Sequence, residues 1–343
     1  MSSPLSTKAA AALTGAVDEI EIPFVMTNTA DEVRETREGA GLIDLGHVQT
    51  VRLSGPDARR FTNGMFTNNI RDLQPGECVR SAMCDDRGRV QGLLDVLCTA
   101  EDTFEGVLEG VSAEWFESRY GLYIVFDDVE MEVFEGAPWV ISLQGPGTAN
   151  ILATAGLPQP APGHHLTSET GIRVTNKDRS GLGGVDLIAD GDSIVDLYDA
   201  LVSAGAVPIG FLALEQLRIE SGRARWPVDG TEKSMVHELA VNEEVCSFNK
   251  GCYLGQEVIN RVDVKGQINK KLQTIVVDAD PAVLTGATVQ MGDKKVGTIT
   301  SAAPSGDHAV ALAVLWKTAW EDGVAVQIEL PSGPVEGKVQ HPA

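Results

Sequence analysis

Two segments of the chain share one pattern, in which alternating apolar and polar positions are followed by apolar residues at helical spacing. The first segment spans residues 51–65 and the second spans residues 141–153, and in each the alternation ends at a Gly-Pro pair. Alternation is typical of a half-buried strand, and a proline with its fixed φ suits the start of a helix. The pattern therefore predicts a repeated strand–helix unit in the first two thirds of the chain.

The same patterns predict further elements around these units. Strands are expected at 90–96, 124–134 and 185–189, and helices around Trp115 and Phe116, over 193–204 and over 211–221. A stretch dense in proline and glycine, residues 156–165, is typical of an ordered surface loop. Alternating strands and helices of this kind favour an α+β architecture.

The pattern changes after Lys271, where short β-like runs recur about every ten to twelve residues. The runs are 273–277, 288–291, 296–301, 309–315, 324–330 and 335–339. Turn residues separate them, which indicates a small barrel or sandwich. The sequence therefore predicts two parts, an α+β region over residues 15–267 and a β-domain over residues 268–343.

Composition limits the classes of function. The 343 residues include 27 Lys and Arg against 49 Asp and Glu, a formal net charge of −22. This balance excludes a binder of nucleic acid or anionic membranes that works through bulk positive charge. No apolar run approaches the roughly 20 residues that cross a bilayer. Lys8 and the acidic residues that follow it argue against a signal peptide.

Cysteine usage indicates a reducing compartment. The chain has five cysteines, an odd number, and no CxxC pair. We therefore expect free thiols and a cytoplasmic protein. Cys246 and Cys252 together with His237 lack the familiar spacing of metal ligands, so no metal site is predicted.

The segment from Asn249 to Arg261 carries the strongest chemical signal. Gly251 and Gly255 would each cost about 1 kcal/mol inside a helix, which predicts a loop followed by a helix from Gln256. Cys252 then lies just ahead of a helix N-terminus and near Lys250 in the sequence. That setting lowers a thiol pKa and makes the thiolate available for chemistry.

A second interpretation of this segment remains open at the level of sequence. Cys252 could be a buried small residue and Lys250 a solvated charge, with the glycines serving only as turn formers. Residues 249–271 hold five basic and two acidic side chains in an otherwise acidic chain. This local excess of positive charge suits the binding of a small anionic ligand. It is equally compatible with an ordinary solvent-exposed surface.

The residues 250–261, KGCYLGQEVINR, resemble the signature of the YgfZ family. Members of this family are folate-binding proteins similar to the aminomethyltransferase, or T-protein, of the glycine cleavage system. Segments 41–47, 53–58, 217–222 and 296–301 extend the resemblance over nearly the whole chain. The resemblance implies T-protein-like folate-binding modules around a central funnel, followed by a small C-terminal β-barrel.

The resemblance also implies a function. It implies binding of tetrahydrofolate or a one-carbon derivative, and a role in assembling or maintaining iron–sulfur proteins, including those that modify tRNA. The partners would be those proteins or their assembly machinery. We expect neither direct, charge-driven binding to nucleic acid nor binding to a membrane. The resemblance makes Cys252 and Lys250 the candidate catalytic residues. The residues expected to contact folate are Arg218, Glu220, Trp226, Tyr253, Gln256, Glu257 and Arg261.

Glu220 is the candidate for the pterin ring, because the matching T-protein segment carries a glutamate that contacts it. A carboxylate can accept two hydrogen bonds from an aminopyrimidine edge. The alternative is a helix-surface acid paired with Arg218 or Arg223.

One departure from the family puts aminomethyl transfer in doubt. The aminomethyltransferases carry a Gly-Gly-x-x-Asp-Asp run, and here Gly92 and Leu93 stand where its aspartates would fall, with Arg80 near the place of a family aromatic. Loss of such a carboxylate typically costs about 10²–10⁴-fold in rate. We therefore expect a folate-binding protein without T-protein catalysis. The alternatives are a folate-dependent aminomethyl- or methyltransferase, and an assembly module without any ligand.

Overall fold

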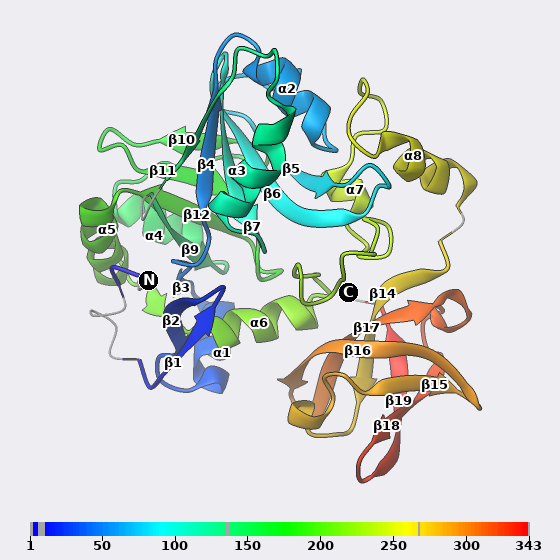
Figure 1. The fold of residues 1–343 in the computed structure, drawn as a ribbon. Helices are drawn as coiled ribbons and strands as arrows, with labels where there is room; N and C mark the ends of the chain where they lie inside the picture. Colours follow the sequence, from blue (N-terminus) through cyan, green and yellow to red (C-terminus); the bar gives the residue numbers. More distant parts are fainter. Residues whose placement is uncertain (1–2, 6–10, 135–137, 267, 342–343) are drawn as a thin grey trace.

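The computed structural model describes residues 3–5, 11–134, 138–266 and 268–341. Within them the chain forms an N-terminal hairpin, two open sheets and a closed C-terminal barrel (Figure 1). The α+β architecture with a terminal barrel that the sequence predicts is confirmed. None of the helices in these described ranges is long and apolar enough to span a membrane.

The first open sheet is antiparallel and has the strand order β5-β6-β7-β4-β8. Its strands are Cys78–Cys84 (β5), Val90–Ala100 (β6), Thr103–Glu109 (β7), Thr50–Ser54 (β4) and Glu130–Val133 (β8). Helices α2 (Ala58–Met65) and α3 (Ala113–Tyr120) cover one face, and a short 3-10 turn, Gly121–Tyr123, follows α3. Phe61, Phe104 and Phe116 pack between sheet and helices and bury this face.

The second open sheet has the order β10-β11-β12-β9-β3-β13, in which only the β3–β13 pair is parallel. Its strands are His165–Thr167 (β10), Arg173–Asn176 (β11), Gly184–Ala189 (β12), Trp139–Gln144 (β9), Gly41–Asp44 (β3) and Val207–Pro208 (β13). Helices α4 (Thr148–Thr154) and α5 (Gly191–Ser203) cover one face. The other face packs toward the first sheet, because Leu97 and Val107 of that sheet share a core with Ile43 and Val140 of this one.

The repeated strand–helix unit is confirmed as β4–α2 and β9–α4. Gly55 and Gly145 adopt φ of +120° and +124°, a conformation that L side chains rarely reach. A Cβ at either glycine would also collide with backbone, which in the case of Gly145 belongs to Thr36 and Gly39. The proline lies in the turn, two residues before each helix begins, so the glycine sets the geometry of the connection.

The prediction of a strand over residues 124–134 is wrong for the first half of that range. Only Glu130–Val133 pairs in the sheet, while residues 124–129 have no strand structure. Val125 and Phe126 are 66% and 97% exposed, so the apolar positions there face solvent instead of a core.

The C-terminal part is a closed antiparallel barrel with the order β14-β17-β16-β15-β18-β19. Its strands are Lys270–Val277 (β14), His308–Trp316 (β17), Lys294–Ser305 (β16), Thr288–Met291 (β15), Ala325–Leu330 (β18) and Gly333–Gln340 (β19), with 3-10 turns at Pro281–Val283 and Lys317–Ala319. Alternate residues such as Val326 and Ile328 fill the interior. The six predicted strands are all present.

Helix α6 (Phe211–Glu220) connects the parts of the molecule (Figure 1). It contacts α1 (Thr29–Glu38), the strand β2 (Ile20–Val25) of the hairpin with β1 (Leu13–Val17), and the barrel strand β16. Its residue Ile219 shares a small core with Leu272 and Leu312 of the barrel. Two helices follow it, α7 (Asn242–Val245) and α8 (Gln256–Lys265), and α8 lies at the edge of the molecule.

Candidate functional site

A cavity of about 270 Å³ lies where the two open sheets, the hairpin and α6 meet. Its walls come from segments far apart in the sequence, including Val17 of β1, Leu108 at the end of β7 and Leu214 of α6. Trp226 and Phe211 add aromatic rings, and Trp226 is held by a hydrogen bond from its indole N–H to the Gln91 carbonyl. Such a lining suits a flat, partly apolar ligand.

Charged side chains line the same cavity in nearly equal numbers. The cations are Arg80, Lys177, Arg179, Arg218, Arg223 and Arg225, and the carboxylates are Asp18, Glu109, Asp178, Glu215 and Glu244. All six cations take part in ion pairs. The site is therefore polar without a large excess of either charge.

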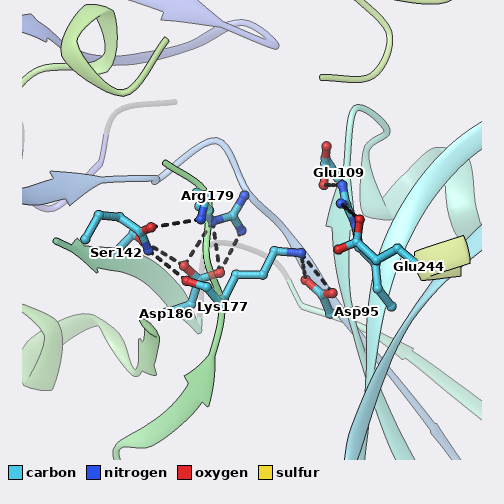
Figure 2. A network of polar contacts seen from close by, with 9 residues as sticks. Asp95, Glu109, Ser142, Lys177, Arg179, Asp186 and Glu244 are labelled. Atoms are coloured by element: carbon cyan, nitrogen blue, oxygen red, sulfur yellow. Dashed lines mark hydrogen bonds and ion pairs between the residues drawn. The ribbon is translucent and has the colours of Figure 1, made fainter. Parts of the chain in front are cut away.

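Lys177 and Arg179 lie in the loop between β11 and β12 and form one of the two polar clusters in Figure 2. Lys177 Nζ lies 2.7 Å from a carboxylate oxygen of Asp95 on β6, which links the second sheet to the first. Arg179 binds both carboxylate oxygens of Asp186 on β12. These contacts fix the loop at the wall of the cavity.

The second cluster contains the carboxylates of Glu109 and Glu244, which are labelled in Figure 2, and both pair with Arg80. Its guanidinium donates to Glu109 of β7 at 2.8 Å and to Glu244 of α7 at 2.9 Å. Burial opposes the charged form of Glu109, but Arg80, with Lys177 and Arg179, outweighs this effect and lowers the pKa of Glu109 to about 2. Arg80, which stands near the sequence position of a family aromatic, therefore joins the cavity wall to α7.

Two of the predicted folate contacts, Arg218 and Trp226, line the cavity. Arg218 is buried, and its guanidinium binds Glu215 at 2.8 Å and Asp229 at 2.5 Å. The third predicted contact on this stretch, Glu220, is not among the residues that line the cavity. Its carboxylate instead pairs with Arg37 and accepts from Gln216. The alternative pairing with Arg218 or Arg223 is not found among the described residues either.

The remaining predicted site residues lie on the loop 249–255 and on α8, and they are not among the residues that line the cavity. Helix α8 begins at Gln256, as predicted, and Glu257 and Arg261, four residues apart, form an ion pair on its exposed surface. Tyr253 is buried among the apolar residues beneath this loop. The Gln256 amide lies 3.4 Å from the Gly251 carbonyl and so packs against the loop.

Cys252 is exposed, which excludes the interpretation that it is a buried small residue. Lys250 is buried and is therefore not a solvated charge. Its ammonium donates to three backbone carbonyls, one in the last turn of α2 and two just after this helix. Burial lowers the pKa of Lys250 to about 7, while the carbonyl acceptors favour its charged form.

Gly92 and Leu93 on β6 are surrounded by hydrocarbon. A Cβ on Gly92 would lie 2.6 Å from the Met83 side chain and 3.1 Å from Val111. Leu93 is fully buried in a core that also contains Val236. Neither position offers space and solvation for a carboxylate.

The sequence did not single out Glu109, Lys177, Arg179 or Glu215, all of which line the cavity. For Glu215 a signal existed, since it stands three residues before Arg218 and so shares a helix face with it. The others come from separate strands and loops. In the described part of the chain, no group of three or more His, Cys, Asp or Glu could hold a metal ion, and all five cysteines are free.

Known proteins are similar to this chain in sequence and in fold. The chain is 27% identical over 330 residues to an aminomethyltransferase of Corynebacterium aurimucosum, covering 90% of this chain and 88% of the relative. It is 26% identical over 302 residues to a putative chloroplastic transferase of Arabidopsis thaliana, covering 84% and 67%. The crystal structure of the glycine cleavage system aminomethyltransferase T from Bartonella henselae has the same fold, with a TM-score of 0.91 at 22% identity over 99% of this chain and 96% of that one.

Two family descriptions match nearly the whole sequence. Residues 6–250 match the GCVT N-terminal domain, and residues 270–343 match the glycine cleavage T-protein C-terminal barrel domain. The open sheets with their cavity and the closed barrel correspond to these two parts. The chain therefore belongs to the glycine cleavage T-protein (GCVT) family.

Proposed function

We propose that this protein is a YgfZ-type member of the family, which binds tetrahydrofolate or a one-carbon derivative and supports iron–sulfur proteins without aminomethyl transfer. The clients would be iron–sulfur proteins or their assembly machinery, including enzymes that modify tRNA. One observation carries the proposal. The cavity is kept, whereas the positions of the family aspartates, Gly92 and Leu93, lie in packed hydrocarbon.

The residues of the cavity fit a reduced folate. Trp226 and Phe211 contribute aromatic rings to the lining, with the Arg225 guanidinium over the Phe211 ring. Glu109 and Glu215 are carboxylates that can accept hydrogen bonds from an aminopyrimidine edge. Arg223 and Arg225 are the two most exposed cations of the lining, at 36% and 28%, and suit the carboxylates of a glutamate tail. Folate, when bound, would supply a carrier for one-carbon groups.

The chain lacks the group that aminomethyl transfer would need. A carboxylate that moves a proton must reach the reacting atoms and be solvated or paired when charged. Leu93 cannot ionise, and Gly92 has no side chain and no room for one. Asp95 shares a face of β6 with Leu93 but lies two residues farther along the strand. Lys177 holds its carboxylate, and Asp95 is not among the residues that line the cavity, so it does not replace either aspartate.

Titration calorimetry with tetrahydrofolate tests the binding. We expect saturable binding, weakened roughly tenfold by Arg223→Ala through loss of one charge-assisted contact. Arg71→Ala, which changes an arginine outside the cavity lining with 63% side-chain exposure, should bind like the unchanged protein. Absence of binding at about 1 mM ligand, where interactions near −4 kcal/mol are already visible, would overturn the proposal.

The iron–sulfur role has its own test in a strain that lacks this gene. The unchanged protein should restore the activity of iron–sulfur enzymes, and Cys252→Ala should not, because Cys252 is the exposed thiol of the signature loop. Val264→Ala on the exposed side of α8 is the matched control and should restore activity fully. Full restoration by Cys252→Ala would show that the thiol is dispensable.

A folate-dependent aminomethyl- or methyltransferase is the second candidate. What favours it is the name aminomethyltransferase carried by relatives such as that of Thermosipho melanesiensis, 25% identical over 93% of this chain and 89% of the relative. The deciding assay measures methylene-tetrahydrofolate formed from an aminomethyl donor. A rate above that of the uncatalysed reaction would establish this candidate and exclude the first.

A further inference from the structure

We infer that Lys250 is a positioning residue, whose buried ammonium fastens the loop that carries Cys252 to residues 63–68, the C-terminal end of α2 and the three residues after it. Lys250 is only 8% exposed, although it lies two residues before an exposed cysteine. Its Nζ lies 2.5 Å from the Asn63 carbonyl oxygen, 2.7 Å from that of Phe66 and 2.6 Å from that of Asn68. Three acceptors for one ammonium match the three protons that it carries.

The groups that accept hydrogen bonds from Lys250 are uncharged backbone carbonyls. Among the described residues Lys250 forms no ion pair, and the centroid of the Tyr253 ring lies 5.0 Å from Nζ. The buried thiol of Cys246 is also close enough to interact with the ammonium electrostatically. A buried ammonium without a carboxylate is expensive unless every proton finds an acceptor. A neutral amine would have one proton fewer and would present a lone pair to a carbonyl oxygen. Only the charged form satisfies all three carbonyls, and it then has no proton left for a contact with Cys252.

Weaker contacts on both sides of Lys250 hold the same two segments together. Before it, the Ser247 amide donates to the Thr67 carbonyl at 3.1 Å, and the Thr67 hydroxyl donates to the Val245 carbonyl at 2.6 Å. After it, the Leu254 amide donates to the Gly64 carbonyl at 3.0 Å. These contacts form a seam between residues 245–254 and residues 63–68, with Lys250 at its centre. Cys252 is exposed between two anchored residues, Lys250 and Leu254.

The seam also reaches the cavity wall. The Asn68 side-chain amide donates to the backbone carbonyls of Arg80 and Glu244, the pair that joins the wall to α7. Lys250 binds the carbonyl of this same Asn68. The ammonium therefore sets where Cys252 lies relative to the cavity, and it acts through position instead of as a nucleophile or base. Only the importance of Cys252 rests on the proposed function, because the seam itself does not depend on folate.

The unchanged protein provides the first test. Acetic anhydride modifies lysines through the free amine, and peptide mass spectrometry reports each site separately. Lys250 should react at least roughly tenfold more slowly than Lys265, which is exposed on α8, because all its protons are bound in a buried site. Equal labelling of the two lysines in the folded protein would overturn the inference.

Lys250→Met provides the second test, with Lys265→Met as the matched control. Hydrogen exchange at Ser247 and Leu254 should accelerate roughly 10- to 100-fold in Lys250→Met, since hydrogen bonds to a charged group are lost, and should not change in the control. The pH midpoint of Cys252 alkylation by iodoacetamide should stay at the value of the unchanged protein. If Lys250→Met does not fold, Lys250→Gln, which keeps two donors, replaces it.

Two results would contradict the role in positioning. A raised pH midpoint for Cys252 alkylation in the Lys250 variant would mean that the ammonium acts on the thiolate directly. Unchanged exchange at Ser247 and Leu254 would mean that Lys250 does not hold the seam. Failure of tetrahydrofolate to bind would overturn the proposed function and leave these measurements unaffected, so the two ideas fail separately.

Discussion

His47 lines the cavity as a neutral imidazole. Its ring lies 5.5 Å from that of Phe211 in an edge-on arrangement. Burial lowers the pKa of His47 to about 3, and the positive charges of Arg179 and Arg225 act in the same direction. At neutral pH the ring can therefore accept or donate one hydrogen bond without adding a charge to the site.

This burial predicts a loss of stability in acid that can be traced to His47. Between pH 6.5 and 3 the unfolded chain binds a proton at this residue and the folded chain does not, so the free energy of unfolding falls as the pH falls. The full effect is up to about 5 kcal/mol, from a pKa near 3 against the ordinary 6.5. Thermal unfolding of His47→Gln across this range should show a flatter pH dependence than the unchanged protein.

Exposed His164 is the control for that measurement, and His164→Gln should keep the pH dependence of the unchanged protein. Burial also lowers the pKa values of His165 and His237, so some acid sensitivity will remain in the His47 variant. An identical slope with and without His47 would show that its ring is not buried as a neutral group.

The residues on α6 show what sequence alone could and could not assign. Arg218 and Glu220 are two positions apart, and residues at that spacing do not share a helix face. Arg218 faces the cavity, so Glu220 points elsewhere and meets Arg37, a partner 183 positions away. Helical geometry combined with the family resemblance would have favoured Glu215, whereas the pairing with Arg37 depends on packing that no local pattern reveals.

Elements with a strict pattern were predictable because the pattern has a local cause. The barrel strands alternate since one face fills a closed interior, and the β4–α2 and β9–α4 turns repeat since each needs a glycine at positive φ. The segment 124–129 failed because its apolar residues are exposed, so hydrophobicity there does not report burial. The seam around Lys250 was equally hidden, because its acceptors are backbone carbonyls, which every residue carries.

The two repeated turns give a prediction about stability. Gly145→Ala would force a side chain into φ +124° and against the Thr36 and Gly39 carbonyls. Gly156 has φ +69°, and a Cβ added there would meet nothing within 4 Å, so Gly156→Ala isolates the strain of positive φ alone. We expect Gly145→Ala to lower the free energy of unfolding by roughly 2 kcal/mol more than Gly156→Ala. Urea denaturation measures both, and equal losses would refute the role given to the repeated turn.

At the scale of the whole molecule, the cavity is a product of the tertiary fold. Lys177, in the loop between β11 and β12, reaches Asp95 of the first sheet, and Arg80 reaches α7, over sequence separations of 82 and 164 residues. Such pairs leave no signal in one sequence, because either partner alone resembles an ordinary charged residue. The fold and the signature loop could therefore be predicted, and the ion pairs that shape the cavity could not.

Asp229 links the barrel to the rest of the molecule. It is fully buried, and its carboxylate binds the Arg218 guanidinium at 2.5 Å. The hydroxyls of Thr300 and Ser301 on β16 donate to its other oxygen at 2.5 and 2.7 Å. Arg218 lines the cavity, so one carboxylate connects the barrel with the cavity wall.

Removal of this carboxylate should damage both stability and binding. In Asp229→Ala, Glu215 is the one ionic partner that Arg218 keeps among the described residues, which should cost about 3–5 kcal/mol in the free energy of unfolding. Glu132→Ala removes the exposed ion pair with Arg52 and should cost no more than about 1 kcal/mol. Because Arg218 would lose its fixed orientation, tetrahydrofolate should also bind more weakly to Asp229→Ala under conditions where the variant is folded. Equal losses of stability in the two variants would mean that the barrel is held by its apolar contacts with α6, centred on Ile219, and that the buried ion pair adds nothing to them.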